Sequence, residues 1–138
     1  GLFPAMRSSG HDIARSGAGR VAGESCWLPS VLREGDIRWS AMGDREVRAS
    51  FSVQGERVDL TLTVAHDGRL EQMVYPRWGN PDGGMFRYER FGGVMETEGS
   101  FQGYTIPTRL RLGWYFGTDR FEREGEFIRI VIDEARYE

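Results

Sequence analysis

The sequence predicts a mainly β protein of the α+β class, in which a curved, half-barrel-like antiparallel sheet of about seven strands packs against one N-terminal helix. Two observations lead to this fold class. Apolar residues recur at helical spacing only over residues 9–28, and from about residue 36 they recur at every second position. Glycines stand where extended segments must turn or bend. We therefore expect a single domain over residues 1–138, with a helix at 9–28 and an antiparallel β-meander at 36–138.

The helix is predicted to begin with Ser9 or Asp12 as its N-cap. Three glycines within it each cost about 1 kcal/mol relative to alanine, so this helix depends on close packing against the sheet. Pro29 ends it, because the residue before a proline avoids helical backbone angles. Cys26 falls on its apolar face, which predicts a small buried hydrophobic side chain.

Two runs of alternating apolar and polar residues, at 47–53 and 58–64, predict a β-hairpin with a tight turn at Gln54-Gly55. A second turn at 66–68 leads to a third strand at 70–75. The hairpin register brings apolar residues opposite one another, pairing Phe51 with Val58, Ala49 with Leu60, and Val47 with Leu62.

The second half of the chain predicts four more strands, at 86–91, 94–101, 104–116 and 127–135. Gly92-Gly93 is predicted to form a bend between the first two, and Gln102-Gly103 to form a tight turn. This register sets Met95 opposite Leu110 and Glu96 opposite Arg109, and it predicts an ion pair between Glu96 and Arg109. Apolar residues on both faces of the last strand predict a central strand or one covered by the helix.

Composition excludes several classes of function. The chain has 18 basic and 21 acidic residues, a net charge of −3 that argues against nucleic-acid binding through bulk charge. Every basic residue is arginine, which excludes lysine-dependent catalysis. No apolar run reaches the ~18 residues of a membrane-spanning helix, and the phosphate-loop, dinucleotide-binding, nucleophile-elbow and zinc-protease motifs do not occur. We expect no cofactor, no metal, no nucleic-acid partner and no membrane span.

Two segments are rich in functional side chains. The first is a predicted loop at 76–84, where Arg77, Trp78 and Asp82 would line the mouth of a cavity. Its Asn-Pro-Asp-Gly-Gly stretch is typical of turns, and by itself it favours the alternative of a plain rigid connector.

The second segment spans residues 103–121 and carries Tyr104, Arg109, Trp114 and Phe116. Successive aromatic residues on a strand point to opposite faces of the sheet. One set is expected in the core, and the other is expected either to line a pocket or to pack under a loop.

Several motifs together resemble an uncharacterised bacterial protein family: Leu2-Phe3-Pro4, Ala18-Gly19-Arg20, Glu24-Ser25-Cys26-Trp27-Leu28-Pro29, Ile37-Arg38-Trp39, the 76–84 loop, Gly103-Tyr104-Thr105-Ile106-Pro107 and the run at 113–120. The resemblance covers essentially the whole chain but only the C-terminal half of the family, which implies a fragment of a longer protein. It implies no activity, because none is established for that family. More remotely, the order of helix and meander is similar to the lipoprotein-carrier half-barrels of the bacterial envelope, which hold acyl chains between a curved sheet and a helix; this likeness is one of fold.

Three hypotheses of function follow. The favoured one is a non-catalytic binding module that holds an apolar or amphipathic, lipid-like ligand between sheet and helix, with the aromatic residues of the two segments as walls and Arg77 or Arg109 at the head group. The alternatives are a small carboxylate and arginine enzyme acting on an anionic substrate, and an assembly domain whose open sheet edge favours a homodimer. The sequence leaves the compartment open between cytoplasm and cell envelope.

Overall fold

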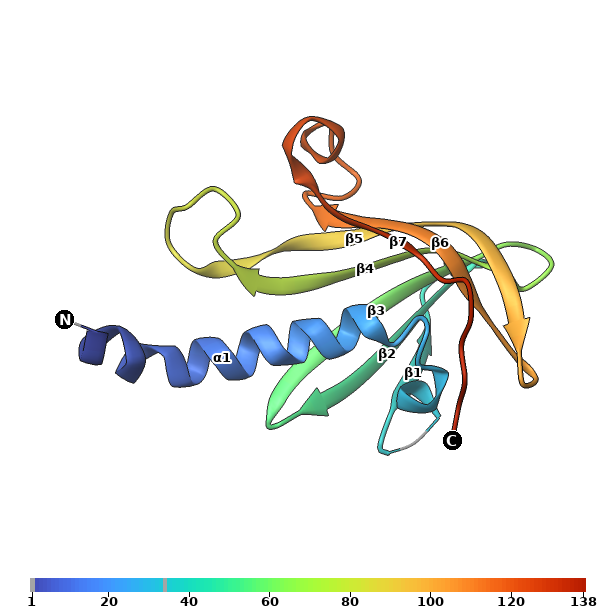
Figure 1. Ribbon diagram of the computed structural model, residues 1–138, viewed down its shortest axis with the longest axis horizontal. Helices are drawn as coiled ribbons and strands as arrows, with labels where there is room; N and C mark the ends of the chain where they lie inside the picture. Colours follow the sequence, from blue (N-terminus) through green and yellow to red (C-terminus); the bar gives the residue numbers. More distant parts are fainter. Residues whose placement is uncertain (1, 34) are drawn as a thin grey trace.

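The computed structural model describes the backbone of residues 2–33 and 35–138, and the side-chain surroundings of residues 10–33 and 35–138. A long helix is followed by a short 3₁₀ helix and by seven strands that form one antiparallel sheet in simple chain order (Figure 1). The elements are α1 (Leu2–Glu24), η1 (Pro29–Leu32), β1 (Arg38–Ala41), β2 (Glu46–Val53), β3 (Glu56–Val64), β4 (Leu70–Gly79), β5 (Arg87–Phe101), β6 (Tyr104–Trp114), the short π-helix η2 (Phe121–Gly125) and β7 (Glu126–Val131). The fold class predicted from the sequence is confirmed.

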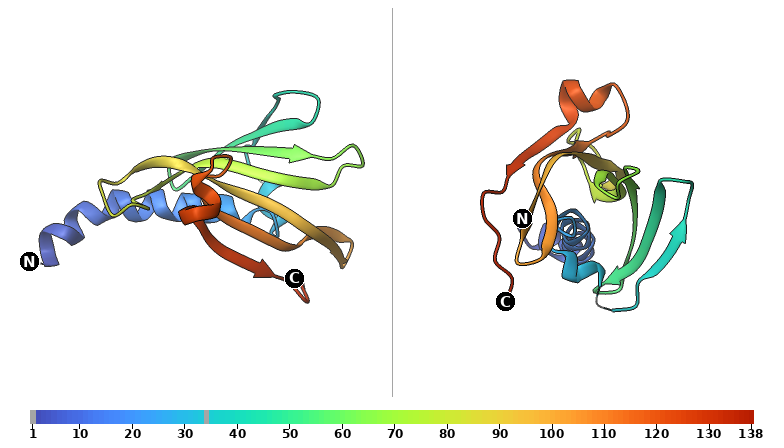
Figure 2. Two further views of the ribbon diagram at one scale, coloured as in Figure 1. Left: turned by 90° about the horizontal axis from the view of Figure 1, so that it is seen from above. Right: turned by 90° about the vertical axis from the view of Figure 1, so that its right-hand side faces the viewer.

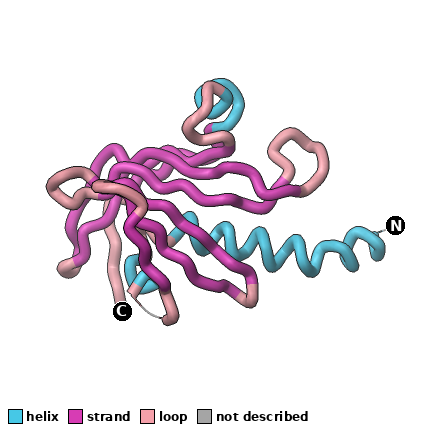
Figure 3. Tube along the Cα trace, turned by 180° about the vertical axis from the view of Figure 1, so that it is seen from behind, coloured by secondary structure: helices cyan, strands magenta, loops and turns pink. Residues whose placement is uncertain are grey.

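The sheet curls around the helix without closing. Seen along the helix axis, α1 lies inside an arc formed by the strands (Figure 2, right), and Figure 3 shows the same wrapping from behind. Within the described part of the chain, β1 and β7 are each paired with a strand on one side only. The result is an open half-barrel with two free edges.

The helix is offset from its predicted position. It begins at Leu2 and ends at Glu24, so Ser9 and Asp12 lie inside it and neither is the N-cap. The early start agrees with Pro4, because a proline is tolerated in the first turn of a helix, where its missing N–H has no partner to lose.

The early end of α1 has a local cause. The Ser25 hydroxyl donates to the carbonyl of Ala22 at 2.7 Å, and the Cys26 thiol lies 3.2 Å from the carbonyl of Gly23. These side chains occupy carbonyls of the last turn, which competes with continuation of the helix. Cys26 is buried as predicted, and burial raises the pKa of its thiol to about 12.

The first hairpins are confirmed in detail. β2 and β3 pair with the predicted register, and the Gln54-Gly55 turn has positive φ at both residues, 50° and 81°, as a two-residue turn between twisted strands requires. The turn at 66–68 and the third strand are also present. Here turn chemistry and alternation agree, and either one alone would give the same register.

The predicted break at Gly92-Gly93 is wrong. β5 runs unbroken from Arg87 to Phe101, because both glycines lie within its pairing with β4 and β6. A β-carbon on Gly93 would lie 1.8 Å from the carbonyl oxygen of Arg111 on β6. These glycines therefore allow the backbones of neighbouring strands to lie close together, and they do not end a strand.

The predicted 76–84 loop begins only at residue 80, because β4 continues to Gly79. Pro76 fits within a strand here since the pairing of β4 with β3 stops at Val74, and Pro76 faces Arg90 of β5 alone. A proline is accepted where one side of a strand has no hydrogen-bonding neighbour.

The predicted ion pair between Glu96 and Arg109 is also wrong. Met95 lies opposite Leu110 as expected, but the register shifts there and Arg109 pairs with Thr97, leaving Glu96 as the extra residue of a bulge. Among the described side chains, no ion pair joins Glu96 to Arg109.

β7 is neither central nor covered. It is the last strand of the sheet, and the side chains of Phe127, Ile128 and Val131 are 63%, 41% and 60% exposed. The apolar residues on both faces of this strand therefore mark a free edge with an uncovered inner face.

The core lies between α1 and the concave face of the sheet. Its largest fully buried side chains include Leu60, Met73, Tyr75, Phe91 and Leu110. No helix in the described part of the chain has the length and apolar content needed to cross a bilayer.

Candidate functional site

A groove of about 320 Å³ opens between the C-terminal half of α1 and the strands β6 and β7. We call it the helix–β7 groove. Its walls come from four parts of the fold: the helix end, β4, the centre of β5, and the inner faces of β6 and β7. The lining residues are Arg20, Gly23, Glu24, Trp27, Tyr75, Arg77, Phe91, Leu112, Phe127, Ile128 and Ile130. Most of these are apolar, and the groove is open at β7 because no strand of the described part of the chain pairs with its far side.

Arg77 is the central cation of the groove. Its guanidinium carbon lies 4.5 Å from the ring centre of Phe91, 5.5 Å from that of Trp114 and 5.7 Å from that of Phe127. Rings at these distances attract a cation through their electron-rich faces. No carboxylate or carbonyl among the described residues pairs with this guanidinium, so its hydrogen-bond donors are left for a ligand or for water.

The helix holds Arg77 in this position. A β-carbon on Gly19 would lie 2.9 Å from Cγ of Arg77, so the stem of Arg77 runs directly against the helix backbone. Next to it, the Tyr75 hydroxyl donates to the carbonyl of Gly19 at 2.7 Å, and burial raises the pKa of that phenol. The expectation that a glycine-bearing helix lies close to the sheet is confirmed at these contacts.

Trp114 supports the groove from behind. Its indole occupies the space that a side chain on Gly79 would take, with Cη2 2.4 Å from the ideal β-carbon position. It meets Phe91 edge to face, with ring centres 5.2 Å apart. Arg77 and Trp114 are the two predicted site residues that the structure brings together.

Trp78 belongs to a different cluster. Its indole N–H donates to a carboxylate oxygen of Asp12 at 2.7 Å, and the Arg15 guanidinium lies 4.4 Å from its ring centre. Phe86 and Tyr88 pack against the same indole. This contact ties the β4–β5 hairpin to the first half of the helix and lies outside the groove.

Tyr104, Arg109 and Phe116 also lie outside the groove. Tyr104 packs against Tyr137 at the β5–β6 turn, with ring centres 4.8 Å apart. Phe116 is buried against Phe121. Arg109 is exposed on the outer face of β6, because it neighbours the inward-facing Leu110. The structure therefore brings Arg77 and Trp114 together at the groove and places the other residues of the predicted site elsewhere.

Asp82 is occupied by an ion pair within its own loop. Arg87 binds it at 3.0 Å and the N–H of Gly84 donates to it at 3.0 Å. These hydrogen bonds lower the pKa of Asp82 to about 2. The β4–β5 loop thus fits the connector interpretation.

This ion pair predicts an acid titration. We expect the Asp82 carboxyl carbon to titrate near pH 2 in an NMR pH series, and to move toward the ordinary value of 3.8 in Arg87→Gln. Because the folded pKa lies below the unfolded one, the stabilisation by Asp82 is complete above pH 3.8 and is lost as the pH falls toward 2. Arg69→Gln, which removes an exposed arginine from another turn, is the control and should leave Asp82 unchanged. An Asp82 that titrates near 3.8 in the unaltered protein would contradict the pairing.

The groove has one carboxylate, and it is paired. Glu24 accepts a hydrogen bond from Nε of Arg20 at 2.8 Å. Elsewhere, hydrogen bonds from Arg87 lower the pKa of Asp82, and hydrogen bonds from Arg129 and Arg111 lower that of Glu126 to about 2. These shifts run opposite to the raised pKa that a general acid requires.

Five lining residues of the groove were not among the predicted site residues: Trp27, Phe91, Phe127, Ile128 and Ile130. The signal for the last three was present, because the apolar residues on both faces of the last strand were noted. The pattern was interpreted as a central strand or one covered by the helix, whereas in the structure the inner face of β7 is partly exposed.

The family-model comparison matches residues 1–137 to a family described as a family of unknown function (DUF6920). No curated protein and no solved structure gives a significant match. The matched range includes the helix, every strand of the sheet and the whole helix–β7 groove. The chain therefore belongs to the family of unknown function DUF6920.

Proposed function

We propose that this protein is a non-catalytic binding module that holds an amphipathic ligand, with an apolar chain and an anionic head group, in the helix–β7 groove. The observation that carries the proposal is Arg77, a cation set among three aromatic rings with no carboxylate partner among the described residues. An arginine in such a place favours a carboxylate or phosphate, which its planar fork can bind through two parallel hydrogen bonds.

The apolar walls supply the second part of the argument. Phe127 and Ile128 are 63% and 41% exposed at the rim of the groove, and covering them would gain roughly 25 cal/mol for each Å² of apolar surface removed from water. A volume of about 320 Å³ is at the lower end for small-molecule sites, so we expect a chain of medium length.

The likeness to lipoprotein-carrier half-barrels supports the proposal as an analogy of layout. In both, a helix lies against the concave face of a curved antiparallel sheet. An analogy of fold raises a hypothesis about the ligand and needs its own test.

The first experiment is binding of decanoate and of decanol, followed by tryptophan fluorescence and by native mass spectrometry. We expect decanoate to bind more tightly than decanol, because Arg77 contacts the carboxylate. A charge-assisted hydrogen bond is worth about 1.5–3 kcal/mol, so Arg77→Met should weaken decanoate binding by about tenfold to a hundredfold. The methionine keeps the apolar stem beside Gly19, so decanol binding should change little.

Arg109→Met is the matched control, since it removes the same charge from the exposed outer face of β6. It should leave decanoate binding unchanged. Equal losses in both variants, or no binding of either probe, would overturn the proposal. The native spectrum also reports the oligomeric state. A dimer without bound amphiphile would favour the assembly interpretation, in which the free edges at β1 and β7 pair with another copy.

A further inference from the structure

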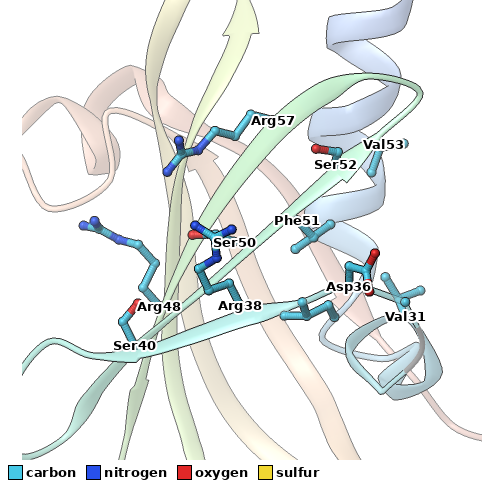
Figure 4. A pocket seen from close by; sticks show the side chains of 12 residues that line it. Val31, Asp36, Arg38, Ser40, Arg48, Ser50, Phe51, Ser52, Val53 and Arg57 are labelled. Carbon is cyan, nitrogen blue, oxygen red and sulfur yellow. The ribbon is translucent and has the colours of Figure 1, made fainter.

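A second cavity, of about 730 Å³, lies at the other edge of the sheet (Figure 4). It is bounded by the segment that leads into β1, by β1 and β2, and by the start of β3. It shares no lining residue with the helix–β7 groove.

The strand register gathers three arginines in this cavity. Arg38 lies opposite Ser50, Arg48 opposite Ser40, and Arg57 opposite Ser52. Residues directly opposite each other project from the same face of a sheet. Each long cationic side chain therefore has a short hydroxyl side chain beside it, which leaves room between the strands, and all six residues line the cavity.

The positive charge of the three arginines is only partly compensated, because two carboxylates lie nearby, Asp36 in the lining and Asp59 on β3. Arg57 pairs with Asp59 at 3.1 Å, and the Ser50 hydroxyl donates to the same carboxylate at 2.7 Å. Burial by itself raises the pKa of Asp59, but these hydrogen bonds and the charges of Arg57 and Arg48 outweigh it and hold the pKa below its ordinary value. Asp59 is thus ionised and occupied by one arginine.

Arg48 is the less usual member of the cluster. Its Nε atom is shielded from solvent and has no hydrogen-bond partner among the described residues. A buried donor on a charged group without a partner costs free energy, and structures normally avoid it. Arg38 likewise has no ion-pair partner in the described part of the chain.

We propose that this cavity binds a phosphate monoester, with Arg38 and Arg48 as the principal contacts. A dianionic phosphate group would supply acceptor oxygens for the unpartnered Nε of Arg48 and an opposite charge for Arg38, and arginine forks match its geometry. Residues 51–53 of β2 continue past the end of the β1 pairing, so among the described strands they pair with β3 on one side only. Their main-chain groups add donors at the same place.

The cavity also has an apolar end, which favours an esterified phosphate over the free ion. Val31, Ile37, Phe51 and Val53 contribute apolar lining, and the last three pack partly against the core. In Figure 4, Phe51 and Val31 lie toward the helix, whereas the guanidinium groups of Arg48 and Arg57 point to the opposite side. The organic part of a phosphate monoester would occupy this end.

The test uses two probes, because the same head group occurs on soluble molecules and on a lipid. Phenyl phosphate is titrated by calorimetry and by amide NMR, and sedimentation is measured with phosphatidylcholine vesicles with and without phosphatidic acid. We expect one of the two to bind and to shift the amides of residues 38, 48 and 50–53. Arg38→Gln with Arg48→Gln should lower the affinity at least tenfold. Binding of phenyl phosphate identifies a soluble ligand, and binding only to phosphatidic acid vesicles identifies the lipid source.

The control double variant is Arg69→Gln with Arg109→Gln, which removes the same charge from exposed arginines elsewhere and should keep the affinity. The arginine cluster is not needed for the fold in this proposal, so the Arg38/Arg48 variant should keep its melting temperature or raise it. An equal loss in the control would show bulk charge only. A fall in melting temperature without a loss of binding would make the arginines structural. Either result, or no binding of both probes, overturns the proposal.

Discussion

Gly93→Ala is expected to lower the free energy of unfolding by about 3 kcal/mol or more. The new β-carbon would lie 1.8 Å from the carbonyl oxygen of Arg111 and 2.8 Å from Cδ2 of Leu112. The obstacle is the backbone of the neighbouring strand, so no side-chain rotation relieves it. β5 and β6 would have to separate at the centre of the sheet, where Gly93 pairs with Leu112.

The measurement is urea unfolding followed by tryptophan fluorescence. Gly43→Ala is the matched control, because Gly43 lies in the β1–β2 turn with no atom within 4 Å of the ideal β-carbon position. We expect this variant to change stability by about 0.5 kcal/mol or less. Equal midpoints for the two variants would mean that β5 and β6 do not approach as closely as the structure shows.

Gly92-Gly93 also shows where sequence analysis reaches its limit. The dipeptide is equally suited to a bend and to close contact with neighbouring backbones, and only the neighbouring strands decide between them. At Gln54-Gly55 the sequence predicts a turn without ambiguity, because the flanking runs alternate between apolar and polar residues. A shift of the strand pairing by one residue in either direction would turn the apolar side chains to solvent. Local information was sufficient for β2 and β3 and insufficient for β5.

Local sequence patterns also explain the position of some predicted site residues and not of others. Arg109 faces outward because side chains alternate along a strand and its neighbour Leu110 is buried opposite Met95. Arg77 and Trp78 are neighbours in sequence but contact the helix at Gly19 and at Asp12. Their separation depends on the path of the helix across the hairpin, which no pattern in the sequence records.

The edge position of β7 could not be predicted from residues 126–131 alone. A central strand and a strand at an uncovered edge can both have apolar residues on both faces, so this sequence pattern does not distinguish between them. What distinguishes the two is whether another strand pairs with its far side, and within the described residues none does. The helix–β7 groove is a consequence of that missing neighbour.

Phe91→Ala is expected to lower the free energy of unfolding by about 3–5 kcal/mol. Phe91 is 1% exposed and joins the core to the groove. Its ring centre lies 5.5 Å from that of Tyr75 and 5.2 Å from that of Trp114, and Arg77 lies over its face. Deleting the ring leaves a cavity that these three neighbours cannot fill without moving the helix or β6.

Phe127→Ala is the matched control, because it deletes the same ring from the same groove at a position that is 63% exposed. We expect it to cost about 1 kcal/mol or less, because little buried surface is lost. Chemical denaturation of both variants measures the difference. If Phe127→Ala were as destabilising as Phe91→Ala, β7 would be part of a closed core. The groove would then be filled by its own side chains, and the unpaired cation of Arg77 would have no space in which to meet a ligand.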